Sequence, residues 1–408
     1  MMRRSLVVFG WLCQAALAAC ASAGSRPVAD TDVSMDDLVA RAMDRASAQL
    51  RRTATTLDPA NGYPRATRAD GSWEQRPANQ WTSGFFAGTL WYMAHATHDP
   101  EWRTLAERWT VGLESNKNIR TTHDLGFMIF NSFGHGYLVT GDRHYRDVVM
   151  EASRSLATRY NPTVGAIKSW ETGNANDARR TWKFPVIVDN LMNLELLFWA
   201  GAHGGDAAWV QMAGQHALTS GRAHVRPDGS TAHVALFDPA TGALEKTVTW
   251  QGYSDSSAWA RGQAWAIHGL TAAYRHTRNP ELLDRAQRAA DWFIAHLPED
   301  RMPYWDFRDP AIPAARRDAS AAAIAASGLY DLARRTQDVT RAAGYRAAAD
   351  RMLRSLATKY MAPATPNGAV LAHSTGGKPQ NVEVDVGLSY ADYYFVEALL
   401  RHSGNFLE

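Results

Sequence analysis

Two aspartates, Asp124 and Asp189, have the sequence surroundings that point most strongly to chemistry. Asp124 precedes the apolar run 125–130, and Asp189 follows the apolar run 184–188. A carboxylate costs free energy to bury unless it is paired or used. Burial and mutual repulsion raise a carboxyl pKa, while a helix dipole or an arginine lowers it. Two aspartates held in this way could supply one proton donor and one anion.

Either aspartate taken alone could be an ordinary helix N-cap, because Asp caps well and its charge suits the helix dipole. Other polar and aromatic residues open the predicted helices at the same end. They are Trp81, His123, Trp259, Arg261, Trp265, Asp318 and Ser320. Two aspartates beside several tryptophans favour a catalytic site over two isolated caps.

Three further features have a plain structural alternative. The clusters 304–307 and 317–320 could be a packed loop and a helix cap, and His233 could be a solvated or structural histidine. The 14 histidines include no pair at metal-ligand spacing beside a carboxylate, and there is no nucleophile elbow, P-loop or dinucleotide motif. We therefore expect no metal and no cofactor.

The elements that must position these residues are helices. Alanine-rich stretches carry apolar residues at helical spacing, and β-branched runs are few. The predicted helices are 32–54, 83–97, 101–117, 124–140, 143–158, 188–201, 206–220, 257–275, 280–296, 318–335, 340–358 and 387–400.

The connections between these helices alternate in length. Short turns at 97–100, 140–142, 204–206 and 277–280 share Gly, Asn, Asp or Pro, whereas most other connections are long. An open superhelix would keep all connections short, but an α/α barrel collects long loops at one end. The pattern predicts an all-α fold, an (α/α)6 barrel of six helical hairpins with an inner and an outer ring.

The N-terminal segment is typical of an export signal. Arg3 and Arg4 precede the apolar run 6–19, which is too short to span a bilayer, and the run ends at Cys20 in a lipobox-like tetrapeptide. Cleavage after the small residues 21–23 is the alternative. We expect a lipoprotein-type signal peptide over 1–19, a linker over 20–30 and one catalytic domain over 31–408. The protein is then periplasmic or anchored to the outer membrane by lipid.

Composition narrows the function further. The chain has 408 residues, 46% of them hydrophobic and 21% charged, which is typical of a folded globular protein. The net charge of +2 argues against a nucleic-acid partner. Cys13 and Cys20 are the only cysteines, so a disulfide framework is excluded. The 15 tryptophans suit packed helices or a surface that stacks on sugar rings.

An ordered set of motifs over residues 75–395 resembles glycoside hydrolase family 88, the unsaturated glucuronyl hydrolases. The matching segments are 79–86 (NQWTSGFF), 123–127 (HDLGF), 188–193 (VDNLMN), 250–253 (WQGY), 257–265 (SAWARGQAW), 303–307 (PYWDF) and 317–322 (RDASAA). The resemblance implies a six-pair α/α barrel, in agreement with the helix pattern.

The resemblance also implies a reaction and its substrate. Such enzymes remove the 4,5-unsaturated uronic acid that polysaccharide lyases leave at the non-reducing end of glycosaminoglycan or similar acidic oligosaccharides. They hydrate the C4=C5 vinyl ether instead of displacing the anomeric substituent. A related group acts on unsaturated rhamnogalacturonyl fragments of pectin, and a non-catalytic sugar-binding lipoprotein is the alternative outside enzymes.

Individual roles follow from the same resemblance. It implies that Asp189 is the general acid and base and Asp124 the second essential carboxylate. Substrate-binding positions are Trp81, His123, His233, Gln251, Trp259, Arg261 and Trp265. Ser374 and Lys378 lie where some members carry a Ser/Lys motif that accepts sulfated substrates. Lys378 fits that motif but the serines do not align, and a flexible glycine-rich loop is the alternative.

Overall fold

The computed structural model describes residues 33–172 and 178–407 of the chain. The predicted signal peptide 1–19, its Cys20 and the linker 20–30 therefore lie outside the described residues. Met35–Glu408 forms one compact unit, and that unit is described below by itself.

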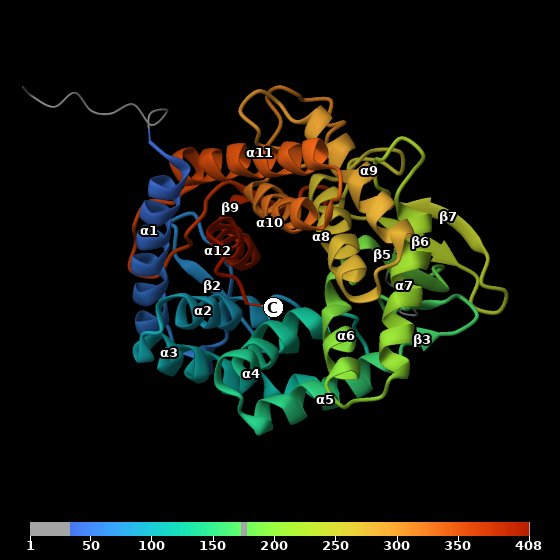
Figure 1. Cartoon of the computed structure of the whole chain (residues 1–408), viewed down its shortest axis with the longest axis horizontal. Coiled ribbons are helices and arrows are strands. Elements are labelled where there is room, and N and C mark those ends of the chain that lie inside the picture. The colour runs from blue at the N-terminus through green and yellow to red at the C-terminus, as the bar shows by residue number, and fades with distance from the viewer. Residues whose placement is uncertain (1–32, 173–177, 408) are drawn as a thin grey trace, which may run out of the picture. The chain divides into compact units, whose positions relative to one another are not determined.

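Within the described ranges the helices of this unit form two concentric rings (Figure 1). The inner ring is α2 (Ser83–Thr97), η3 with α4 (Gly126–Gly134 and His135–Thr140), η4 with α6 (Val188–Asn193 and Glu195–Ala202), α8 (Ala260–Thr277), α10 (Ala319–Arg335) and α12 (Ser389–Ser403). The outer ring is α1 (Met35–Thr56), α3 with η2 (Pro100–Thr110 and Val111–Asn118), α5 (Arg143–Ala157), α7 (Ala208–His224), α9 (Pro280–His296) and α11 with η5 (Val339–Ser355 and Leu356–Tyr360).

The two rings differ in how much of each helix is buried. In α2 every residue from Ser83 to Ala94 is buried, and α10 is buried along nearly its whole length. The outer helix α5 instead buries one face and exposes the other. A helix that is apolar nearly all round belongs inside, and an amphipathic one covers it. The inner ring closes because α12 packs against both α10 and α2. The (α/α)6 barrel is confirmed.

The short turns between inner and outer helices are built as the sequence predicts. Asp99, Asp142 and Asn279 cap α3, α5 and α9, each accepting a hydrogen bond from the backbone N–H two residues further on. Asp206 accepts in the same way from the Ala208 N–H, 2.9 Å away. These side chains satisfy N–H groups that the first helical turn leaves without partners.

The long connections contain strands that the helix pattern does not predict. They are β1 (Tyr63–Thr67) with β2 (Trp73–Arg76), β3 (Tyr160–Asn161) with β4 (Ala166–Ile167), β5 (Phe184–Ile187) with β6 (Val234–Phe237) and β7 (Leu244–Val248), and β8 (Ser374–Gly377) with β9 (Val382–Val386). All these pairings are antiparallel. A single 3₁₀ turn, η1 (Pro59–Asn61), precedes β1.

The β5–β6–β7 sheet bears directly on function. The sheet buries apolar side chains on both of its faces. One face, formed by Ile187, Val234, Leu236 and Val248, is covered by Trp170, Trp182 and Trp250. Pro185 pairs with Leu236 in the register between β5 and β6. Strand β5, which leads directly into η4, is thereby held against β6, more than forty residues later in the chain. No helix in the described ranges is long and apolar enough to cross a membrane.

Candidate active site

Asp189 lies in the first turn of η4, immediately after strand β5. The Val188 N–H donates to the His233 carbonyl at 3.0 Å and so continues the β5–β6 pairing by one residue. That bond brings the His233 ring to the aspartate, with Nε2 3.8 Å from Oδ2. The pairing of two strands therefore assembles the first two site residues.

The carboxyl of Asp189 is poised to hold a proton near neutral pH. Burial raises the pKa of Asp189 to about 7; the charge of Asp124 adds to this rise and Arg261 opposes it. The side chain is 13% exposed. An acid with this pKa can both donate and accept a proton at neutral pH. Asp124 and Asp189 stand near the starts of η3 and η4, which contact each other where Asn193 Oδ1 accepts from the Phe127 N–H at 2.8 Å.

His233 presents a fixed N–H to this carboxyl. Its Nδ1 accepts hydrogen bonds from the backbone N–H groups of Trp250 and Gln251, both at 3.1 Å. Burial lowers the pKa of His233 well below its usual value, so the ring is neutral and its proton must be on Nε2. The two backbone donors therefore select the tautomer that points an N–H at Asp189.

Asp124 stands just before η3 with two polar neighbours. Thr122 donates its hydroxyl to Oδ2 at 2.5 Å, and the His123 Nε2 lies 3.2 Å from Oδ1. His123 Nδ1 lies 2.9 Å from the Ser169 carbonyl, so it donates there. Burial lowers the pKa of His123, while the Asp124 charge opposes that change. The Thr122 hydroxyl is therefore the side-chain donor that orients the Asp124 carboxylate, which is 13% exposed.

Arg261 is buried and held from three directions. Its Nη1 donates to Asp318 at 3.0 Å and to the Thr375 carbonyl at 2.6 Å, and its Nη2 donates to the Gly376 carbonyl at 2.5 Å. The guanidinium lies 4.4 Å from the Trp259 ring centroid, a cation–π contact. Asp318 also caps α10 through the Ser320 N–H. The capping and ion-pairing roles of this residue therefore coexist.

The tryptophans surround these polar groups. Trp259 packs against the His233 ring at 4.7 Å between centroids. Trp81 packs against Tyr390 at 5.1 Å, and the buried Trp265 packs against Phe127 at 5.5 Å. All three come from the beginnings of inner helices. Since the N-terminal ends of those helices meet at one end of the barrel, residues far apart in sequence share one site.

The remaining predicted positions lie on the same side. Gln251 follows β7 and donates to the Gly376 carbonyl at 3.4 Å. Ser374 begins β8 and is fully buried, whereas Lys378 is half-buried in the β8–β9 turn. The roles of Gln251, Ser374 and Lys378 toward a ligand stay predictions.

Several buried polar atoms of this region have no hydrogen-bond partner among the described residues. They include Asp189 Oδ2, His123 Nε2, His233 Nε2, Ser374 Oγ and Tyr390 Oη. Buried polar groups are normally paired in folded proteins, so unpaired ones at a site indicate where a polar ligand or water binds. A hydroxylated molecule would supply the missing bonds.

Some site residues were not singled out from the sequence. Thr122 supports Asp124, and Tyr390 faces the Arg261 guanidinium at 5.3 Å from its ring centroid. Trp170 packs against the His233 ring edge, with centroids 6.0 Å apart. Thr122 precedes the 123–127 motif and could have been identified from the sequence. The sequence around Trp170 and Tyr390 has no motif that indicates a role at the site.

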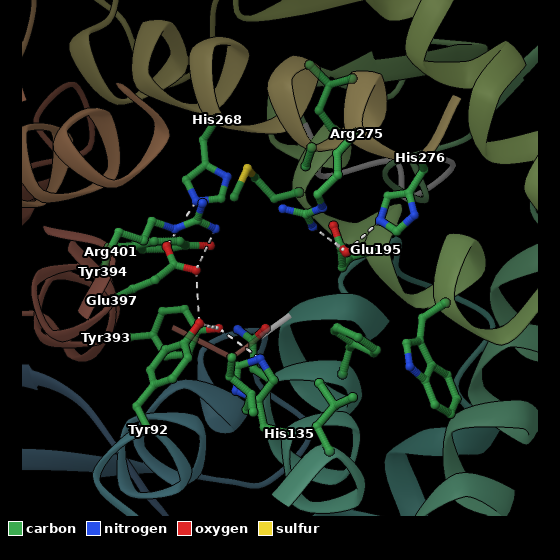
Figure 2. Close-up of a pocket in the computed structure, with 18 of the residues that line it drawn as sticks. Tyr92, His135, Glu195, His268, Arg275, His276, Tyr393, Tyr394, Glu397 and Arg401 are labelled. Carbon is green, nitrogen blue, oxygen red and sulfur yellow. Dashed lines mark hydrogen bonds and ion pairs between the residues drawn. The ribbon is translucent and has the colours of Figure 1, made fainter. Parts of the chain in front are cut away.

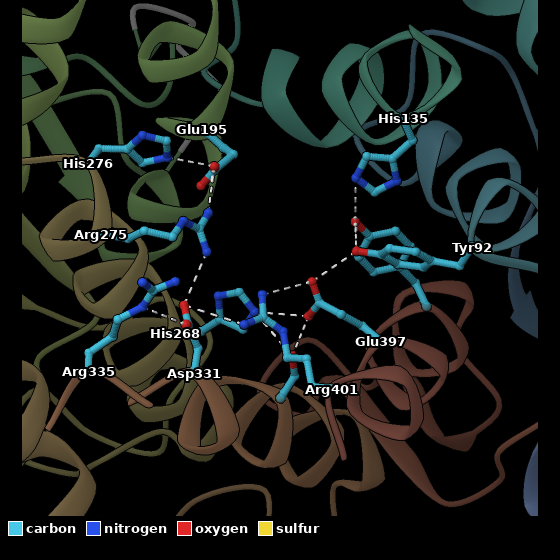
Figure 3. A network of polar contacts seen from close by, with 12 residues as sticks. Tyr92, His135, Glu195, His268, Arg275, His276, Asp331, Arg335, Glu397 and Arg401 are labelled. Carbon is cyan, nitrogen blue, oxygen red and sulfur yellow. Dashed lines mark hydrogen bonds and ion pairs between the residues drawn. The ribbon is translucent and has the colours of Figure 1, made fainter. Parts of the chain in front are cut away.

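A second polar cluster lines a cavity of about 250 Å³ toward the other ends of the inner helices (Figure 2). Glu397 accepts from the Tyr92 hydroxyl at 2.9 Å and lies 3.0 Å from His268 Nε2. Arg275 bridges Glu195 and Asp331, at 2.6 Å and 3.1 Å, as Figure 3 shows. These charges pair with one another, so the loss of one partner would leave an uncompensated buried charge.

Known proteins resemble this chain in sequence and structure, although no family model matches it. An unsaturated glucuronyl hydrolase of Formosa agariphila is 43% identical over 348 residues, 84% of this chain and 85% of the relative. An unsaturated chondroitin disaccharide hydrolase of Streptococcus pneumoniae is 32% identical over 370 residues, 89% and 91% of the two chains.

A crystal structure of an unsaturated glucuronyl hydrolase specific for heparin superimposes with a TM-score of 0.86 at 39% identity, covering 90% of this chain and 98% of the other. The relatives are named unsaturated glucuronyl hydrolases or an unsaturated chondroitin disaccharide hydrolase, which favours the predicted glucuronyl hydrolase over the rhamnogalacturonyl and non-catalytic alternatives. With its closed double ring of helices and these relatives, the chain belongs to the unsaturated glucuronyl hydrolase family.

Proposed function

We propose that this protein removes the 4,5-unsaturated uronic acid from the non-reducing end of lyase-generated oligosaccharides by hydrating its C4=C5 bond. The observation that carries the proposal is the Asp189 carboxyl, whose pKa of about 7 suits an acid that must give and retake a proton. Its family and its inner-ring position support the same assignment.

The reaction needs one proton donor and one water. Asp189 donates its proton to C4, which leaves positive charge on C5 and the ring oxygen. Water adds at C5 and returns a proton to Asp189. The hemiketal at C5 opens to a ketone, and the hemiacetal left at C1 releases the rest of the chain as an alcohol. The distance rule for two-carboxylate glycosidases does not apply, because no substituent is displaced at the anomeric carbon.

The neighbours of Asp189 have complementary tasks in this proposal. The His233 Nε2–H, 3.8 Å away, favours the carboxylate that remains after proton transfer. Asp124 accepts hydrogen bonds from sugar hydroxyls and raises the Asp189 pKa. Arg261 binds the substrate carboxylate, and Trp81, Trp259 and Trp265 contact the apolar faces of the sugar rings.

The test is an ultraviolet assay on unsaturated disaccharides from chondroitin, hyaluronan, heparin, gellan and xanthan lyases. Turnover removes the C4=C5 bond and its absorbance. We expect activity toward at least one substrate and none in Asp189→Asn, which should still fold. Full activity in Asp189→Asn would contradict the role of this residue.

Sulfated glycosaminoglycan fragments are the substrate class that we propose first. One relative is named as specific for heparin, and a Streptococcus agalactiae relative with 30% identity and a TM-score of 0.77, covering 90% of this chain and 92% of the other, is described in complex with dGlcA-GalNAc6S. Lys378, in the β8–β9 turn, is the candidate cation for the sulfate. Lys378→Ala should lower kcat/KM on sulfated disaccharides and leave unsulfated ones unchanged; equal loss on both would contradict this.

We also propose that the protein is exported and lipidated at Cys20. The charged, apolar and small-residue regions of 1–23 support this. Mass spectrometry of the mature N-terminus should find a modified cysteine, and Cys20→Ser should release the protein from membranes. An unmodified mature N-terminus beyond residue 21 would contradict lipidation and leave export intact.

A further inference from the structure

The β8–β9 hairpin, residues 374–386, holds an unusual concentration of backbone strain. Among the described residues, Asn381, Glu383 and Asp385 have φ of +52°, +55° and +62°, and His373, just before β8, has +61°. Residues with a Cβ rarely adopt this left-handed region, and they persist there only when their surroundings hold them. The strand pairing also shifts register between Ser374 and Thr375.

The strained hairpin supplies two of the contacts that hold Arg261. The carbonyls of Thr375 and Gly376 accept from both terminal nitrogens of its guanidinium, and Gly376 also accepts from Gln251. The plane and direction of a guanidinium determine which oxyanion it can bind with two parallel hydrogen bonds. A hairpin that drifts would therefore turn Arg261 as well.

A largely buried ion pair joins this hairpin to strand β1. Arg65 of β1 donates through Nε to Glu383 of β9, and its Nη1 reaches Gln80 at 3.2 Å, next to Trp81. The two charged side chains are only 19% and 11% exposed. A surface pair of this kind would contribute little, but partial burial limits screening by solvent.

Glu383 is also locked from inside the hairpin. A Cβ added to Gly376 would lie 2.6 Å from Glu383 Oε2, so only glycine leaves room for this carboxylate between the strands. The Glu383 carboxylate thus contacts Arg65 and also packs on Gly376, whose carbonyl accepts from Arg261.

We propose that the Arg65–Glu383 pair is a positioning device for the reaction: it fixes the strained hairpin, whose Thr375 and Gly376 carbonyls then aim Arg261 at the carboxylate of the unsaturated sugar. Neither Arg65 nor Glu383 needs to touch the substrate. The inference rests on the proposed function, because it takes Arg261 to be the group that binds the sugar carboxylate.

The test uses Arg65→Gln, Glu383→Gln, the double variant and the charge swap Arg65→Glu/Glu383→Arg, assayed on the best unsaturated disaccharide. Small displacements of a site residue commonly cost about ten- to a hundredfold in rate. We expect each single variant to lower kcat/KM by about tenfold or more, mainly through KM. The double variant should lose no more than the worse single one, and the swap should regain part of the loss.

Arg316→Gln is the matched control. Arg316 pairs at 2.7 Å with Asp385, which lies on β9 as Glu383 does, but the Arg316 side chain is 57% exposed. Removing this exposed pair should leave kcat/KM unchanged. Unchanged kcat/KM in Arg65→Gln and Glu383→Gln would overturn the proposal. The proposal would also be overturned if the losses in kcat/KM of the two single variants added up in the double variant, tracked the fall in melting temperature and were not reduced in the charge swap. Absence of turnover in the unaltered protein would instead refute the proposed function itself.

Discussion

The Asp189 side chain is buried, its Oδ2 has no hydrogen-bond partner among the described residues, and the Asp124 carboxylate is nearby. Each of these features favours the protonated acid over the carboxylate. Arg261 acts in the opposite direction, because its positive charge lowers the Asp189 pKa. Keeping the Asp189 carboxyl buried reduces the free energy of unfolding at pH values where an exposed aspartate would be ionised. This reduction can be measured separately from activity.

Asp189→Asn should raise stability in a pH-dependent way. The folded-state pKa of Asp189, about 7, lies above its unfolded value, so the folded protein binds the extra proton and loses stability as pH rises between about 4 and 7. The variant should therefore be more stable than the native chain at pH 8, by on the order of a few kcal/mol, and equally stable near pH 4. Thermal or urea unfolding at both pH values measures this difference.

Asp206→Asn serves as its control, because Asp206 only accepts a hydrogen bond from the Ala208 N–H before the outer helix α7, and Asn can accept the same bond. A stability gain in Asp189→Asn that is the same at pH 4 and pH 8 would show that the carboxyl is not held protonated.

The same pKa predicts how activity responds to pH. If Asp189 must carry the proton that goes to C4, kcat/KM should fall as pH rises above about 7, since the acid is then ionised. A pH–rate profile on one unsaturated disaccharide checks this. A profile that continues to rise well above pH 8 would assign the proton to another group.

At the scale of elements, the site depends on how closely η3 and η4 approach. Gly126, which opens η3, lies against Asn193 at the end of η4, and Asn193 Oδ1 also accepts from the Phe127 N–H at 2.8 Å. Asp124 and Asp189 stand at the starts of these same two elements. Their separation is therefore set by a backbone contact that leaves no room for a side chain.

Gly126→Ala should separate the two elements and lower activity. The added Cβ would lie 2.5 Å from the Asn193 Cα, so the backbone must move and the aspartates move with it. We expect a loss of about tenfold or more in kcat/KM, with a destabilisation of about 1–3 kcal/mol. Steady-state kinetics and thermal unfolding measure the two effects.

Gly344→Ala is the matched substitution in the outer helix α11, where a new Cβ meets nothing within 4 Å. Alanine is the better helix former there, so the protein should gain about 0.5–1 kcal/mol at unchanged activity. Wild-type kinetics in Gly126→Ala would mean that this contact does not set the position of the aspartates.

At the scale of the whole molecule, the inner ring is held by two different kinds of interaction. Apolar and small side chains fill most of it. The cluster around Glu195, Asp331 and Glu397 links α6, α8, α10 and α12 through charged side chains, and the Tyr92 hydroxyl joins α2 to Glu397. Burial opposes ionisation of Glu397, but Arg401 and His268 outweigh it and hold the Glu397 pKa well below its usual value. The same balance, with Arg401 and Arg275, leaves the Asp331 pKa at about 2.

These lowered pKa values predict acid lability. A carboxyl whose folded pKa is depressed stabilises the protein above its unfolded pKa, and that stability is lost as pH falls from about 4.5 toward 2. Glu397→Gln should cost about 3 kcal/mol at pH 7, because it removes the buried carboxylate that contacts Arg401 and His268, and clearly less near pH 3. Unfolding free energies at the two pH values test this.

Glu245→Gln removes a carboxylate of similar type from an exposed pair with Lys183, and it should change stability by less than about 0.5 kcal/mol at either pH. Equal costs for Glu397→Gln at pH 3 and pH 7 would contradict a role for its charge.

Much of the architecture is encoded locally and could be predicted from the chain alone. Helix periodicity, the caps at Asp99, Asp142 and Asn279, and the alternation of loop lengths are properties of short segments, and they are enough to predict the barrel. The predicted helix 83–97 matches α2 at both ends, and 280–296 matches α9. The motifs around Asp124 and Asp189 indicated that both belong to one end of the barrel.

Only the tertiary structure decided how the site is completed. The strands within the long loops are short, and their pairings join segments far apart in sequence, so no local pattern reveals them. The β5–β6 pairing brings His233 to Asp189, and the β8–β9 hairpin brings two carbonyls to Arg261. A hydrogen bond between distant backbones depends on the whole chain being folded. Short segments of the sequence therefore determine the helices and the positions of Asp124 and Asp189 on them. The folded loops determine which groups contact Asp189 and Arg261.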